Sequence, residues 1–129
     1  MTEAVIIEQN NIGNVWPLVK DYIGRCDHKR FNSNDIYDCL LESTLSLVMV
    51  YEDSILKGAC IFKVSNVKKK KILITVLGGD GANWDNAIKD FSRQLLERGF
   101  KRLEIQGRRG WLKALNDFDE LHTTIGKDL

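Results

Sequence analysis

The sequence predicts a single α/β (α+β) domain over residues 1–129, with a mixed, mainly antiparallel sheet of about six strands flanked by helices. Three observations predict this class. The stretch Leu73 to Gly99 reads as a strand, a glycine turn and a helix. Its strand is the last of three that short turns connect, which is typical of an antiparallel meander. A further strand, Phe100 to Gln106, follows the helix, and such a helical crossover favours a parallel neighbour.

The central stretch carries the clearest local signals. Ile72 to Leu77 is apolar and rich in β-branched residues, which indicates a buried strand that stops at Gly78-Gly79-Asp80-Gly81. Asn83 then caps a helix that ends before Gly99, placed as the C′ residue. Five apolar residues recur at helical spacing and form one face of this helix: Trp84, Ala87, Ile88, Phe91 and Leu95.

The helices and strands outside the central stretch are predicted from helix-capping residues, turn residues and alternating apolar and polar positions. The sequence predicts helices capped by Asn14, with Pro17 in the first turn, and by Ser33 or Asn34. It predicts a short helix from Trp111 to Leu115 after a Gly107–Gly110 turn. The other predicted strands are Val5 to Ile7, Leu45 to Tyr51, Ile55 to Val67 and Glu120 to Ile125, with Lys68–Lys71 as a hairpin tip. The predicted order is therefore β-α-α-β-β-β-α-β-α-β.

Composition narrows the function classes. The net charge of +1 argues against nucleic acid or an anionic membrane as the partner, and no apolar run is long enough to cross a membrane. The N-terminus has no secretory pattern, and three widely spaced cysteines predict reduced thiols in a cytoplasmic setting. His28 and His122 lack metal-ligand spacing, so we expect no metal site.

Several segments resemble the GNAT superfamily of acyl-CoA N-acyltransferases. Val48 to Gly58 is similar to that family's second and third strands, and Leu96 to Ile105 to its long helix and fifth strand. Short phage-encoded members share a Trp-Pro pair like Trp16-Pro17, a double glycine followed by tryptophan, and a Gly-Arg-x-Gly-Trp turn like the one beginning at Gly107. The resemblance covers nearly the whole chain and implies a sheet splayed between its fourth and fifth strands.

The resemblance implies that the turn after the fourth strand would hold the pyrophosphate of acetyl-CoA on backbone N–H groups. The cofactor-binding residues that it implies are Leu77, Gly78, Gly79, Gly81, Ala82 and Asn83. Two residues depart from the family pattern. Val76 stands where the family has Arg or Gln, and Asp80 adds a carboxylate beside the pyrophosphate position. The pyrophosphate motif is therefore degenerate.

No catalytic residue can be assigned from the sequence. The family's usual general acid is a tyrosine on the helix after the fifth strand, and there is none between Trp111 and Phe118. Glu104 could serve as a general base, and Thr75 could hold a water. Cys26, Cys39 and Cys60 lack the surroundings of a nucleophile.

Three functions therefore stay open. The first is an N-acyltransferase that moves an acetyl group from acetyl-CoA to an unidentified amine. The second is a non-catalytic phage structural or host-interaction module that keeps the fold without the cofactor, which would place it in the host cytoplasm or the virion with a protein partner. The third uses Lys68–Lys71 and Arg108-Arg109 on nucleic acid, against which the balanced charge argues.

Overall fold

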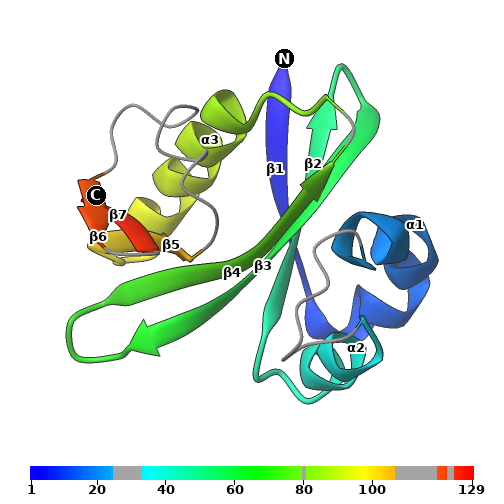
Figure 1. Cartoon of the computed structure of the whole chain (residues 1–129), viewed down its shortest axis with the longest axis horizontal. Coiled ribbons are helices and arrows are strands. Elements are labelled where there is room, and N and C mark those ends of the chain that lie inside the picture. Colours follow the sequence, from blue (N-terminus) through cyan, green and yellow to red (C-terminus); the bar gives the residue numbers. More distant parts are fainter. Residues whose placement is uncertain (25–32, 80, 107–118, 122–123) are drawn as a thin grey trace.

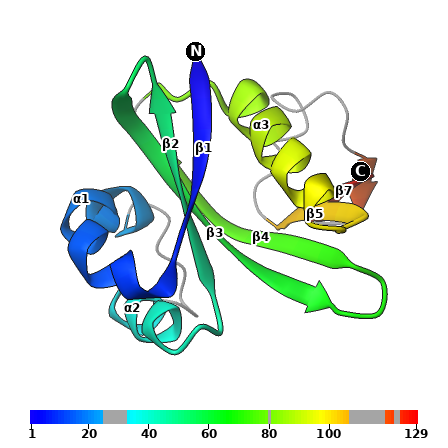
Figure 2. The same cartoon turned by 180° about the vertical axis from the view of Figure 1, so that it is seen from behind.

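The fold is one sheet with helices on both of its faces (Figures 1 and 2). The structure is a computed structural model that describes residues 1–24, 33–79, 81–106, 119–121 and 124–129. The strands are β1 (Thr2–Ile7), β2 (Ser46–Glu52), β3 (Ile55–Asn66), β4 (Lys71–Gly79), β5 (Arg102–Gln106), β6 (Asp119–Leu121) and β7 (Thr124–Asp128). The helices are α1 (Ile12–Gly24), α2 (Ser33–Leu41) and α3 (Trp84–Glu97), with a short 3-10 turn, η1 (Gln9–Asn11), before α1.

The strand order β1-β2-β3-β4-β5-β7-β6 confirms the predicted mixed sheet. β1 to β4 form an antiparallel meander, and α3 crosses over so that β5 runs parallel to β4. Where a single tail strand was predicted, the structure has two antiparallel strands, β6 and β7, and β7 also pairs antiparallel with β5. The described residues therefore form seven strands.

Two hydrophobic cores lie on opposite faces of the sheet. On one face, Ile88, Phe91 and Leu95 of α3 pack against side chains from β1 to β5. On the other face, the apolar sides of α1 and α2 cover alternate residues of β2, β3 and β4, among them Leu47 and Ile61. Because neighbouring strand residues point to opposite faces, strands β2 to β4 are buried on both sides. This explains why their sequences read as continuous apolar runs.

Polar side chains of α3 attach this helix to the edge strand β1. The Ala4 N–H donates to Asp90 Oδ2 at 2.9 Å, and the Ala4 carbonyl accepts from Gln94 Nε2 at 2.7 Å. Both backbone groups of Ala4 point away from β2, so without α3 they would be open to pairing with another strand. The two contacts close this part of the edge and hold α3 against β1.

Two predicted boundaries near α1 and β4 were wrong. The first helix begins at Ile12, so Asn14 lies inside it and is not its cap, and Pro17 also lies inside the helix. The Ile12 N–H already bonds to the Gln9 carbonyl of η1, and the Ile12 side chain is buried. A 3-10 turn and the core therefore start the helix. β4 continues through Gly78 and Gly79, which were predicted to be part of the turn.

Candidate functional site

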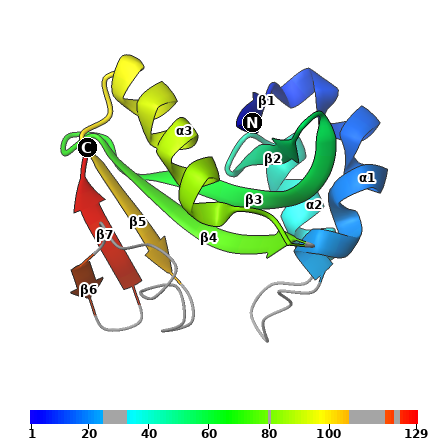
Figure 3. The same cartoon turned by 90° about the horizontal axis from the view of Figure 1, so that it is seen from above.

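β4 and β5 are neighbours over only half the length of β4. The parallel pairing runs from Lys71 opposite Arg102 to Ile74 opposite Ile105, and β4 then continues to Gly79 with no partner on that side among the described strands. Figure 3 shows the two arrows diverging from a common start. The splay that the resemblance implied is therefore present, and it begins at Ile74.

A β-bulge marks the point of divergence. Ile74 lies opposite Phe62 of β3 and Val76 lies opposite Ile61, so Thr75 is an extra residue without a partner of its own. The Thr75 hydroxyl donates to the Ile61 carbonyl at 3.5 Å. After the bulge, Val76 belongs to the core under α1, whereas Ile72 and Ile74 belong to the core under α3. The bulge therefore reorients β4 where its free edge begins, as bulges near functional sites do.

The residues predicted to bind the cofactor lie at the far end of this free edge, on either side of residue 80. Leu77, Gly78 and Gly79 end β4, and Gly81, Ala82 and Asn83 lead into α3. The Leu77 side chain is buried in the core, so only its backbone could face a ligand. Gly81 and Asn83 are exposed. Asp80, which was predicted to weaken anion binding, lies outside the described residues.

Gly79 is required by strand packing. It lies opposite Gly58 of β3, and a Cβ added at Gly79 would come within 2.5 Å of the Lys57 carbonyl oxygen and 3.1 Å of the Gly58 Cα. A Cβ at Gly58 would come within 2.8 Å of the Gly78 carbonyl oxygen and 3.0 Å of the Trp84 ring. The two glycines let β3, β4 and Trp84 approach closely. The position of the turn therefore depends on this contact.

We expect Gly79→Ala to lower the free energy of unfolding by about 1–3 kcal/mol, because the nearest atoms are backbone and cannot rotate away. Urea denaturation measures this change. Gly13→Ala is the matched control, since a Cβ there meets only the Tyr37 hydroxyl at 3.7 Å and replaces a glycine within α1. A Gly79→Ala midpoint equal to that of the wild-type chain would contradict the packing argument.

Beyond Gly79 the turn is open. Gly81 has a φ of +70°, and a Cβ built there has no neighbour within 4 Å. The Asn83 side chain caps α3 by accepting from the Asn86 N–H at 3.2 Å, as predicted. Over the part of the chain that the structure describes, the N–H groups of Gly81 and Ala82 donate to no acceptor. These donors lie at the positive end of α3, where an anion is favoured.

Two carboxylates lie at the start of α3, those of Glu52 and Asp85. The Asn83 N–H donates to Glu52 Oε1 at 2.6 Å, and Glu52 is the last residue of β2. Asp85, in the first turn of α3, pairs with Lys89 at 3.2 Å. Asp53 bonds to the amino group of Met1, which raises the pKa of this amine through the hydrogen bond and charge of Asp53. Glu52 was not singled out from the sequence, because nothing local links residues 52 and 83.

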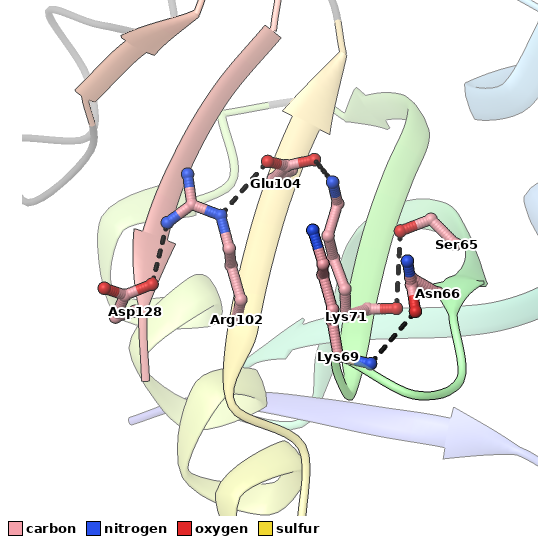
Figure 4. A network of polar contacts seen from close by, with 7 residues as sticks. All are labelled: Ser65, Asn66, Lys69, Lys71, Arg102, Glu104 and Asp128. Atoms are coloured by element: carbon pink, nitrogen blue, oxygen red, sulfur yellow. Dashed lines mark hydrogen bonds and ion pairs between the residues drawn. The ribbon is translucent and has the colours of Figure 1, made fainter.

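Glu104 is held in a charged network on the face of the sheet opposite α3 (Figure 4). It is 9% exposed and accepts from Lys71 Nζ at 2.9 Å and Arg102 Nε at 3.1 Å. Arg102 Nη1 also contacts Asp128 at 2.8 Å. Gly126 leaves room for this guanidinium, since a Cβ there would lie 2.7 Å from Arg102 Nη2. The network joins β4, β5 and β7 at the paired end of the sheet.

The environment of Glu104 does not suit a general base. Burial alone would raise the pKa of Glu104, but hydrogen bonds and charge from Lys71 and Arg102 outweigh it, and the pKa lies below its usual value. A carboxylate with a lowered pKa binds a proton weakly, and its oxygens are already engaged. Glu104 also lies opposite Leu73, before the splay begins. Its position favours a structural role over the catalytic one considered from the sequence.

Cys60 and the basic run Lys68–Lys71 were also considered as functional features from the sequence. Burial raises the pKa of the Cys60 thiol to about 12, which argues against a nucleophile there. Lys71 belongs to β4 and pairs with Glu104, so the hairpin tip comprises only Lys68 to Lys70 of the predicted basic run. The predictions for Cys26, His28, the Gly107–Gly110 turn, the Trp111–Leu115 helix and His122 concern residues outside the described ones.

The described residues hold neither a membrane-spanning helix nor a metal site. No helix in them combines the length and apolarity of a membrane span. They also contain no group of His, Cys, Asp and Glu side chains arranged to hold a metal ion.

Comparison with known proteins identifies the fold. No protein-family model matches the chain, and no curated protein matches it. Solved structures do match over nearly the full chain. The GNAT family N-acetyltransferase YhbS from Escherichia coli, in complex with CoA, aligns with a TM-score of 0.70 and 10% identity over 97% of this chain and 79% of that one.

Two further matches are of the same kind. PaiA N-acetyltransferase from Thermoplasma acidophilum, in complex with coenzyme A, gives a TM-score of 0.61 and 9% identity, covering 100% of this chain and 99% of that one. AAC(6')-Ib in complex with ribostamycin and coenzyme A gives a TM-score of 0.65 and 8% identity, covering 98% of this chain and 93% of that one. The chain therefore has the GNAT fold. Its resemblance to phage-encoded members stays a prediction.

Proposed function

We propose that this chain is an N-acyltransferase that uses acetyl-CoA and an amine acceptor. One observation carries the proposal: β4 leaves β5 at Ile74, bulges at Thr75 and ends in a turn that is open at Gly81. Proteins with the same fold have coenzyme A bound, and one of them also holds the aminoglycoside ribostamycin. These complexes support a CoA thioester as the donor and an amine as the acceptor.

The free edge of β4 suits an extended ligand. The pantetheine arm would lie along residues 75–79, where β4 has no β5 partner, and the pyrophosphate would lie at the N–H groups of Gly81, Ala82 and Asn83. The distance between the bulge and Gly79 is about 13 Å at the usual rise of a strand. In this proposal the backbone, and no particular side chain, makes the main contact with the donor.

The reaction follows from this placement. The amine nitrogen attacks the thioester carbonyl carbon, a new C–N bond forms, the C–S bond breaks, and the proton lost by the amine ends on the departing thiolate. A backbone N–H on the free edge of β4 would stabilise the oxyanion that develops at the carbonyl. The Thr75 hydroxyl, which donates to the Ile61 carbonyl, keeps lone pairs that can hold a water near the amine.

Amine-dependent thiol release tests the proposed function. The purified chain is incubated with acetyl-CoA and, separately, with a polyamine, an aminoglycoside and a lysine-containing peptide, while free thiol is followed with a chromogenic reagent. We expect release above the uncatalysed rate with one class of amine. Release that no amine accelerates, at millimolar concentrations of donor and acceptor, would contradict an acyltransferase.

A further inference from the structure

The proposed donor site already contains an anion of the chain's own. The Glu52 carboxylate accepts from the Asn83 N–H at 2.6 Å, across 31 residues of sequence. Asn83 is the N-cap of α3, so its amide belongs to the set of donors at the positive end of that helix. A carboxylate on such a donor makes a strong, charge-assisted hydrogen bond.

We infer that Glu52 competes with the pyrophosphate of CoA for the Asn83 N–H, and that donor binding requires the Glu52 side chain to swing away. The inference rests on the proposed function. One N–H cannot donate fully to two anions, and a carboxylate left beside a pyrophosphate would repel it. Glu52 would therefore act as a determinant of donor affinity and specificity.

The backbone around Glu52 allows this side chain to move alone. Glu52 is held at the end of β2 by pairing with Thr2 on one side and Ile55 on the other. The following turn has positive φ at both Asp53 and Ser54, the pattern of a tight two-residue hairpin. The strand is thus fixed, whereas the half-buried glutamate can leave Asn83 through side-chain rotation.

A titration of wild-type, Glu52→Ala and Glu52→Gln chains with CoA tests the competition. We expect Kd to fall about tenfold or more when the charge is removed, because the lost contact is a charge-assisted hydrogen bond. Glu52→Gln removes the charge but keeps an acceptor for the Asn83 N–H. It therefore still tests the inference if Glu52→Ala fails to fold. Asp53→Asn is the matched control, since it removes the adjacent carboxylate, which bonds to Met1.

A second ligand, pantetheine, separates this effect from a general change of the site. It lacks the pyrophosphate, so its affinity should be the same for the wild-type chain and both Glu52 variants. Tighter CoA binding by the Glu52 variants alone supports the inference. Equal CoA affinities across all chains, with wild-type binding intact, overturn the competition and leave the proposed function standing. If no chain binds CoA, both fail.

Discussion

Gly81→Asp should weaken the binding of acetyl-CoA by at least about a hundredfold. The Cβ of the new side chain would enter space that is empty within 4 Å, and its carboxylate would add a negative charge to the turn proposed to hold the pyrophosphate. Two like charges 4 Å apart repel by about 4 kcal/mol at an effective dielectric constant of 20, which is more than such a loss requires. Calorimetric titration with acetyl-CoA measures the change.

The chain offers a close control for this substitution. Gly99, just beyond the other end of α3, also has a positive φ, +90°, and also has open space around a built Cβ. Aspartate tolerates this backbone region better than most residues, so both substitutions should cost folding about 1–2 kcal/mol. Gly99→Asp should bind acetyl-CoA like the wild-type chain. Equal affinities for the two variants would place the pyrophosphate elsewhere.

The Glu104 carboxylate should contribute strongly to the stability of the fold. Removing the Glu104 carboxylate, as in Glu104→Ala, should lower the free energy of unfolding at neutral pH by about 2–3 kcal/mol. Breaking a buried pair typically costs about 3–5 kcal/mol, and the partial exposure of the Lys71 and Arg102 side chains, 29% and 27%, reduces this value. Urea denaturation at neutral pH measures the loss. Glu97→Ala, whose carboxylate is 66% exposed in its pair with Arg93, should change little.

The same carboxylate predicts acid sensitivity. The pKa of Glu104 in the folded chain lies below its ordinary value of 4.5, so its ionised form stabilises the fold fully above that pH. The contribution is lost as the pH falls below 4.5 and through the lowered pKa. We therefore expect the stability difference between wild-type and Glu104→Gln chains to shrink in this acidic range. A difference that stays constant with pH would contradict the proposed role of the charge.

Local signals were enough to predict most elements. Asn83 caps α3 and Gly99 follows it with a positive φ, and both are properties of a few neighbouring residues. The meander and the parallel crossover were predicted from short turns and one helix of sufficient length. The prediction that Asn14 caps the first helix was wrong, because a polar residue before an apolar stripe is only one way to start a helix. Here η1 starts α1 instead.

The site could be predicted only in part, because its shape depends on contacts between distant residues. The glycine turn and its six candidate residues were visible in the sequence, but the reason for Gly79 is its approach to Gly58 across the sheet. The bulge at Thr75 depends on the register with β3. Glu52 reaches Asn83 only once β2 and α3 are packed. No pattern in the sequence encodes such pairs.

Calorimetric titration of the wild-type chain with acetyl-CoA at moderate salt measures whether the chain binds the proposed donor. We expect one binding site per chain with a micromolar Kd, reached despite the Glu52 carboxylate at the turn. The absence of binding up to millimolar acetyl-CoA would contradict it, because the splay between β4 and β5 would then be a property of the fold without a donor to fill it.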